Sequence, residues 1–453
     1  MITEQNTELN TELNTELDLF EELDHMKIDK RLKKRLNRTA HTLYKKPGMA
    51  VLAASENIAE AKAIYRLVAN KKFEKTELIE VHRQSVMQKV KDKNLKIVLC
   101  PQDTCDLNYT GLKCTLGIGH IGCSKDFARG LHLHTSIALD ENGTPLGILA
   151  QDVWARNTYK KLTSEEKKKL PLEEKESYKW VKNVNESLKG APEGVDFITI
   201  CDREGDMFEL FARCIREKQK FLVRSIFDRN TDGPEKSFET VRNAEIAGKL
   251  TVHVPRDTRR GLPERDATLI IKYKKMRLKK PSYLKGYPNV VAVTLVLAEE
   301  ENPLVGIEPI SWYLLTNVTV SSFEDAVTMV KWYVHRWKIE RFHYVLKSGC
   351  GVEKIQSSDA VRLIKLITIL SLIAIKILTM TYFARFYPET SCTEFFTDEE
   401  WKVLYCVVNE TTVIPIEPIT VKKAVFLLAK LGGFAGRKSD GCPRRKSHLA
   451  WHA

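Results

Sequence analysis

Two apolar runs, each followed by an aspartate, constrain the fold of this chain more than any other feature. The first runs from Leu95 to Cys100 and leads into Asp103, and the second runs from Val195 to Cys201 and leads into Asp202. Short apolar runs of this kind predict strands buried on both faces, as in the middle of an α/β sheet. Open α/β sheets place their chemistry at the carboxyl ends of the strands. The runs therefore predict an α/β core with acidic chemistry at one edge.

The remaining patterns predict further domains around this core. A length of 453 residues suggests about three domains. Strand patterns recur through the middle of the chain, and helical patterns dominate both flanks. We expect an acidic low-complexity tail at 1–26, a helical domain at 27–90, an α/β domain at 91–357 with a β-rich insertion at about 225–318, and a helical C-terminal domain at 358–453.

The net charge of the chain indicates what kind of molecule it binds. The chain carries a formal net charge of +13, which favours a polyanion, either nucleic acid or an acidic membrane surface. The most apolar stretch, Leu366 to Ile375, lies between two lysines and is too short to span a bilayer. We therefore expect a buried helix there and no membrane partner.

Cysteine usage indicates a reducing compartment. The ten cysteines are scattered and form no C-x-x-C pair, which argues against a zinc ribbon and a disulfide framework. The first 26 residues have no apolar segment typical of a signal peptide. These features predict a cytoplasmic protein.

Asp103 and Asp202 suit a hard divalent cation. Carboxylate oxygens without Cys or His partners favour Mg²⁺ or Mn²⁺ over zinc. For either aspartate alone, a simple turn after a strand is the better interpretation, since aspartates are common there.

A third acidic residue lies in a predicted helix over residues 333–347. At about 100° per residue, one face carries Tyr333, Arg336, Glu340 and Lys347, and the opposite face carries Ile339, Phe342, Val345 and Leu346. A single carboxylate among cations is explained if Glu340 binds a metal while Arg336 and Lys347 bind phosphates. A surface stripe of ion pairs is the alternative.

These residues together resemble the IS4 family of DDE transposases, and most closely its Tn5-like members. The resemblance rests on Asp103, on Asp202, and on the spacing Tyr333-x2-Arg336-x3-Glu340-x6-Lys347. It implies that Asp103, Asp202 and Glu340 are the catalytic, metal-binding triad of an RNase H-like core. Two Mg²⁺ ions per active site, for which Mn²⁺ could substitute, would activate the attacking oxygen and stabilise the leaving oxygen.

The same resemblance assigns DNA contacts. Tyr333, Arg336 and Lys347 would grip DNA near the element end, Arg224 would add an active-site cation, and Trp312 would stack on a flipped base. A flipped base costs a few kcal/mol, and stacking on an aromatic ring returns about 1–3 kcal/mol. A core position in its strand is the alternative for Trp312. In the N-terminal domain, the residues implied in recognition of terminal repeats are Arg35, Lys45 and Arg66.

The expected function is cut-and-paste transposition in a prokaryotic cytoplasm, in association with the nucleoid. A homodimer would bind the terminal inverted repeats of double-stranded DNA in a synaptic complex, cleave the ends, with a hairpin intermediate in this subgroup, and join them to target DNA.

Two alternatives remain. After Gly436 the sequence departs from the family. The C-terminal dimerisation domain that the resemblance implies is therefore expected to be truncated. The protein could then be an inactive, regulatory copy that binds DNA ends but dimerises defectively. A metal-dependent nuclease on the same core is the other alternative.

Overall fold

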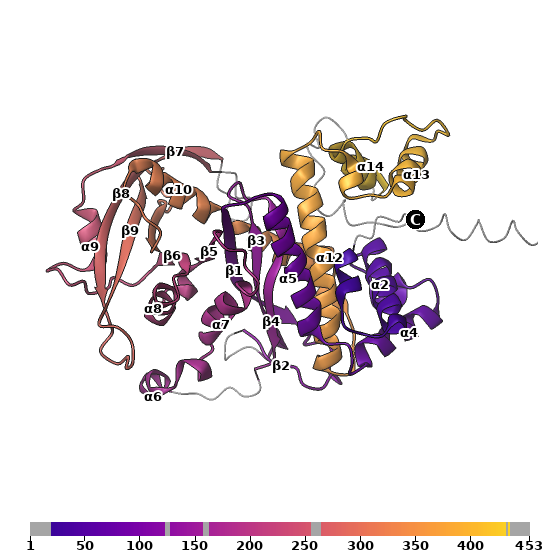
Figure 1. Cartoon of the computed structure of the whole chain (residues 1–453), viewed down its shortest axis with the longest axis horizontal. Helices are drawn as coiled ribbons and strands as arrows, with labels where there is room; N and C mark the ends of the chain where they lie inside the picture. The colour runs from indigo at the N-terminus through magenta and orange to yellow at the C-terminus, as the bar shows by residue number, and fades with distance from the viewer. Residues whose placement is uncertain (1–19, 123–126, 157–162, 255–263, 432–433, 435–453) are drawn as a thin grey trace, which may run out of the picture.

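A single large sheet runs through the middle of the protein in the computed structural model (Figure 1). The structure describes residues 20–122, 127–156, 163–254, 264–431 and 434. Ten strands of the described residues form this sheet, in the order β2-β3-β1-β5-β6-β10-β9-β8-β7, with β4 paired to β3. The fold is therefore mixed α/β, as the apolar runs predict.

The central strands contain the two predicted runs. β1 pairs in parallel with β5, which pairs in parallel with β6, while β3 and β4 form an antiparallel hairpin beside β1. Both faces of this region are covered by helices, which explains the unbroken apolar character of β5. The strands are β1 (Ile97–Asn108), β2 (Gly119–His120), β3 (Arg129–Leu139), β4 (Pro145–Trp154), β5 (Asp196–Cys201) and β6 (Lys220–Ser225).

The predicted β-rich insertion extends the same sheet. β10 pairs antiparallel with β6, so strands from the insertion continue the core sheet outward instead of forming a second sheet. Alternating burial along β7 indicates one packed and one exposed face. The elements are α9 (Ser237–Arg242), β7 (Gly248–Val254), β8 (Arg265–Lys279), β9 (Val290–Glu300) and β10 (Ser311–Thr316).

Helices between the strands cover the core. α7 buries Trp180 against the sheet, although the lysine-rich segment around it predicts an exposed insertion. The remaining helices of this region are α6 (Ser164–Lys169), η2 (Leu172–Glu174), α7 (Tyr178–Ser187), η3 (Arg203–Gly205), α8 (Phe208–Arg216), α10 (Phe323–Val334), α11 (Trp337–Tyr344), the π-turn η4 (Val345–Gly349) and η5 (Val352–Lys354).

The long helix α12 (Ala360–Phe386) joins the parts of the molecule. It packs against β4 and against helices of both flanks, and Figure 1 shows it between the sheet and the N-terminal helices. Among the described helices it alone is long and apolar enough to cross a membrane, but 83% of its most apolar window is buried inside the protein. The predicted buried helix at Leu366–Ile375 is thus confirmed as the middle of a core helix.

The N-terminal helices pack on the opposite side of α12 from the sheet, except α5, which packs on β4. The predicted tail lies mostly outside the described residues. Its end forms the short helix η1, anchored by Phe20, Leu23 and Met26, which are buried. These elements are η1 (Glu21–His25), α2 (Lys30–Lys45), α3 (Val51–Ala54), α4 (Ile58–Ala69) and α5 (Lys75–Asp92).

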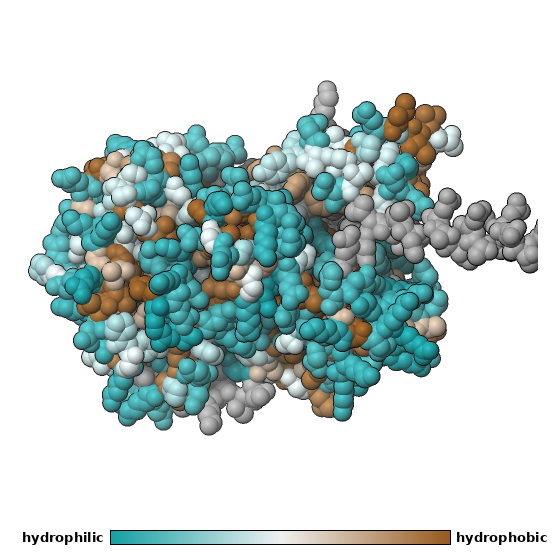
Figure 2. Space-filling view, in the orientation of Figure 1, coloured by the Kyte–Doolittle hydropathy of each residue, from teal (hydrophilic) through white to brown (hydrophobic). Residues whose placement is uncertain are grey.

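The C-terminal helices form a small unit with its own apolar cluster at one end of α12. They are η6 (Cys392–Glu394), α13 (Asp398–Asn409) and α14 (Val421–Leu431). A hydrophobic patch is visible at this end of the molecule (Figure 2), and the exposed apolar residues of α13 and the following loop include Val403, Val407, Val413 and Ile416. The predicted truncation after Gly436 lies outside the described residues.

Candidate active site

Asp103 and Asp202 lie side by side at one edge of the parallel strands. The last residues that β1 and β5 pair with each other are Pro101 and Ile200, and each aspartate lies two residues farther along the chain, Asp103 within β1 and Asp202 just after β5. The prediction that Asp103 follows the end of its strand is wrong, because β1 continues to Asn108 through its pairing with β3. Asp103 nevertheless lies beyond the last pair with β5, so both carboxylates share the expected edge.

Backbone amides hold both carboxylates. The Thr104 N–H donates to Asp103 Oδ1 at 2.8 Å, and the Glu204 N–H donates to Asp202 Oδ1 at 2.9 Å, where Asp202 caps η3. Such bonds restrict each side chain to one orientation, which is what a preorganised site requires.

Electrostatics show that a third carboxylate is close. Burial, followed by the charges of Asp202 and Glu340, raises the pKa of Asp103 to about 7, while the Thr104 amide and Arg336 act in the opposite direction. Three carboxylates that repel one another in a partly buried site favour a bound cation.

Glu340 reaches this site from α11, but its carboxylate is occupied. Arg336 Nη2 donates to Glu340 Oε1 at 2.7 Å, and Arg336 is buried, with only 7% of its surface exposed. Burial alone would lower the pKa of Arg336, but Tyr333 and Glu340 raise it above its ordinary value. Arg336 is therefore a fixed positive charge beside the three carboxylates.

The predicted continuous helix over 333–347 is wrong in one respect. α10 ends at Val334, α11 begins at Trp337 after a turn, and α11 passes into the π-turn η4. The predicted packing face is confirmed, since Ile339, Phe342, Val345 and Leu346 are all buried.

The predicted DNA-contact residues lie in two groups. Tyr333 lies with Arg336 near the carboxylates, whereas Lys347 lies farther along and pairs with Glu353 at 3.6 Å. Burial raises the pKa of the Cys105 thiol, and Lys347 is close enough to act in the opposite direction. Cys105 lies two residues after Asp103 in β1, so both side chains point to the same face of the sheet. Lys347 is therefore on the same side of β1 as Asp103.

Trp312 and Arg224 border the site from the insertion side. The Trp312 ring meets Tyr333 edge-on at 5.4 Å between centroids, and it is half-buried. Arg224 Nη2 donates to the carbonyl of Ser311 at 3.4 Å, next to Trp312. Five predicted residues from four separate segments thus surround the carboxylates or border them: Trp312, Arg224, Tyr333, Arg336 and Glu340.

The donor set fits Mg²⁺, although the present arrangement is not a closed ligand cage. In the part of the chain that the structure describes, no three His, Cys, Asp or Glu side chains converge closely enough to hold one ion as they stand. The Arg336–Glu340 ion pair explains this for Glu340. Burial, followed by repulsion from Asp202 and Glu340, raises the pKa of Asp103, and carboxylate oxygens of this kind are the ligands that a hard cation prefers.

A buried polar network behind Asp103 is not foreseen from the sequence. The Gln102 Oε1 atom can only accept, so His134 donates from Nε2 at 2.9 Å and accepts at Nδ1 from the Thr104 hydroxyl at 2.8 Å. Gln102 also donates to Cys201 Sγ at 3.5 Å. Burial holds the pKa of His134 well below its ordinary value, so the ring is neutral. The alternation of His132 and His134 on one strand is the only sequence signal for this network.

In the N-terminal domain, the predicted residues lie on a basic surface. Lys45 on α2 and Arg66 on α4 are exposed. Arg35 lines a hollow of about 430 Å³ between α2 and α4, together with Arg31, Lys34 and Arg38. This helical pair therefore offers cations to a ligand without using the carboxylate site.

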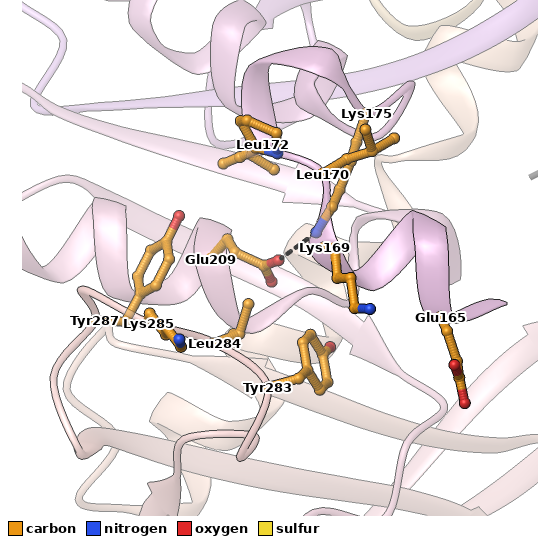
Figure 3. A pocket seen from close by; sticks show the side chains of 11 residues that line it. Glu165, Lys169, Leu170, Leu172, Lys175, Glu209, Tyr283, Leu284, Lys285 and Tyr287 are labelled. Atoms are coloured by element: carbon orange, nitrogen blue, oxygen red, sulfur yellow. Dashed lines mark ion pairs between the residues drawn. The ribbon is translucent and has the colours of Figure 1, made fainter. Parts of the chain in front are cut away.

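Another cavity lies between α6 and the β8–β9 loop, away from every predicted site residue. It has a volume of about 510 Å³. Figure 3 shows Lys175 and Glu209 facing each other across it, 3.8 Å apart. None of the predicted catalytic or DNA-contact residues lines this cavity.

Comparison with known proteins identifies a transposase DNA-binding segment in the N-terminal part of the chain. Residues 21–73 match a family model described as Transposase DNA-binding, which covers η1 and α2 to α4. Among solved structures, the chain is similar to a piggyBac transposase synaptic complex with hairpin DNA, with a TM-score of 0.35 and 12% identity over 76% of this chain. The chain spans 64% of that chain's length. At this TM-score the similarity does not establish a common fold.

Proposed function

We propose that the protein is a DDE transposase of the IS4 type, which binds terminal inverted repeats, cleaves DNA at the element ends and joins the ends to target DNA. The observation that carries this proposal is that Asp202 and Glu340, from two other elements, lie near enough to Asp103 for their charges to act on its carboxylate. The match of residues 21–73 to a transposase DNA-binding family supports it independently. The antiparallel strands β4, β3 and β1 followed by parallel β5 and β6 support an RNase H-like core.

Asp103, Asp202 and Glu340 would hold two Mg²⁺ ions, or Mn²⁺ in their place. When bound, the ions would supply the positive charge that favours attack at phosphorus and departure of the leaving oxygen. The protein's own residues orient the DNA: Arg336 offers a buried guanidinium to a phosphate, and Tyr333 and Arg224 border the same space. Arg336 occupies only Oε1 of Glu340, so the other carboxylate oxygen would be the one offered to an ion.

The partly exposed ring of Trp312 supports base stacking next to the cut, and with it a hairpin intermediate. The exposed apolar residues of α13, including Val403 and Val407, support contact between two subunits at the C-terminal domain. The setting of this reaction would be a prokaryotic cytoplasm, at the nucleoid.

Cleavage of a duplex that carries the DNA bordering this gene, in Mg²⁺ or Mn²⁺, tests the proposal. Wild type should cut at the element end. Glu340→Gln should lose cutting by at least about 10²-fold, because a metal ligand is removed, and should bind the duplex as wild type does. The control Glu324→Gln changes an exposed glutamate at the start of α10 and should cut normally.

Three other results would change the assignment. End binding without cutting by wild type would indicate a regulatory copy. Cutting without end specificity would indicate a nuclease. Cutting that survives Glu340→Gln would remove α11 from the active site.

A further inference from the structure

A second hollow, of about 800 Å³, adjoins the candidate active site on the α7 side of the sheet. Thr104 and Arg203, the residues that directly follow Asp103 and Asp202, both line it. Because neighbouring residues of a strand point to opposite faces, Thr104 faces this hollow while Asp103 faces α11. A DNA strand that crosses the edge of the sheet can therefore reach both.

Among the described residues that line the hollow, one cation has no ion-pair partner. Each carboxylate in the wall already has a partner: Glu176 with Arg156 at 2.6 Å, Glu204 with Lys179 at 3.4 Å, Asp206 with Arg229 at 2.7 Å, and Asp106 with His132 at 2.7 Å. Arg203 is exposed and has no ion-pair partner among the described residues. One free positive charge matches the single negative charge of a phosphodiester group.

His132 adds a buried donor position. The residue is only 3% exposed, and Asp106 Oδ1 accepts from its Nδ1–H. The other ring nitrogen, Nε2, is buried and has no hydrogen-bond partner in the part of the chain that the structure describes. A buried polar atom without a partner costs about 1–3 kcal/mol, so a ligand that satisfies Nε2 gains affinity. A phosphate oxygen that accepts from Nε2–H satisfies this atom.

The rim of the hollow suits the rest of a nucleotide. Phe227 is 55% exposed and Ile226 is 46% exposed, and both line the opening. Aromatic and aliphatic side chains beside a phosphate site are typical of surfaces that bind unpaired nucleotides.

We propose that this hollow binds one phosphodiester group of the DNA strand that passes the candidate active site, through Arg203 and His132. The inference rests on the proposed function, since it takes DNA as the ligand. It adds a contact on the side of the sheet opposite to α11.

The test is equilibrium binding of the full chain in EDTA, so that no cutting occurs. The probes are duplexes that carry the DNA bordering this gene, each with a single neutral methylphosphonate at a different position near the element end. Wild type should lose affinity roughly tenfold at one position, as expected for a charge-assisted hydrogen bond. Arg203→Gln should bind the unmodified duplex about tenfold more weakly and show no further loss at that position.

Two further variants sharpen the result. His132→Gln keeps a polar partner for Asp106. Its affinity should not fall further when the methylphosphonate is placed at the position to which Arg203→Gln is also insensitive. The control Arg216→Gln removes an exposed cation of α8 that does not line the hollow, and it should reproduce the wild-type profile.

The proposal is wrong if the methylphosphonate lowers the affinity of Arg203→Gln by the same factor as it lowers that of wild type at every position. It is also wrong if wild type binds none of the duplexes. Because the readout is metal-free binding, it is separate from cleavage. If one phosphate position depends on Arg203 but the protein cleaves no DNA, this binding site is supported and the proposed reaction is wrong.

Discussion

Asp103 is costly to ionise in the folded protein, because burial and the charges of Asp202 and Glu340 all oppose its negative charge. In the unfolded chain its pKa returns to about 3.8, while in the folded protein it is about 7. The folded state therefore binds more protons than the unfolded state between these values, and stability falls as pH rises from about 4 to about 7. A cation bound beside Asp103 would offset this unfavourable free energy of ionisation.

Replacement of Asp103 by Asn should consequently stabilise the metal-free protein. We expect the gain in the free energy of unfolding to approach about 4 kcal/mol at pH 8 and to be only about 2 kcal/mol at pH 5. Urea denaturation in EDTA at both pH values measures the difference. The control is Asp196→Asn, at the exposed start of β5, and equal gains for the two variants would refute the role of the carboxylate cluster.

At the scale of elements, the segment after α11 holds the N-terminal domain against the core. Gly48 and Gly351 both have positive φ, of +83° and +59°, and a Cβ on either would lie 2.8 Å from a backbone oxygen of the facing loop. Lys354 Nζ also donates to the Gly48 carbonyl at 3.3 Å. The two loops thus pack backbone against backbone, close to the π-turn that follows the candidate site.

Gly351→Ala should lower stability for two reasons. The left-handed conformation costs a residue with a Cβ about 1–2 kcal/mol, and the contact with Gly48 adds a steric clash. Gly190→Ala is the matched control, since Gly190 has φ of +77° and nothing within 4 Å of its would-be Cβ. Thermal unfolding should show a clearly larger loss for Gly351→Ala, and equal losses would mean that the loop contact contributes nothing.

For the whole molecule, α12 makes the domains mutually dependent. It contacts β4, the N-terminal helices α2 and α4, and the C-terminal helix α14. Deletion of the N-terminal domain would expose one side of this apolar helix, so its DNA binding is better tested by point substitutions on its exposed surface.

The double substitution Lys45→Gln, Arg66→Gln should weaken binding to the element end without affecting folding, because both side chains are exposed. For every phosphate that the variant no longer neutralises, the slope of log K against log salt should become shallower by about 0.9. The control Lys402→Gln, in an exposed pair with Asp398 on α13, should leave affinity and slope unchanged. A slope that stays at the wild-type value would place the DNA elsewhere.

The sequence by itself determined the local features of this protein. Apolar runs specified β1 and β5, recurring strand patterns specified the β-rich insertion, and helical spacing specified the buried face of α11. These patterns are local because the period of each element is fixed by backbone geometry. The spacing of Tyr333, Arg336 and Glu340 is likewise a local pattern.

Tertiary structure alone decided what these elements do to one another. A turn interrupts the predicted helix between Tyr333 and Glu340, Lys347 pairs with Glu353, β3 extends β1 past Asp103, and Arg336 binds one oxygen of the predicted metal ligand Glu340. The neutral His134 network and the unsatisfied Nε2 of His132, within the described part of the chain, likewise arise from contacts between strands and α7. Burial, repulsion and hydrogen-bond satisfaction depend on neighbours that are distant in sequence, so only the packed molecule fixes them.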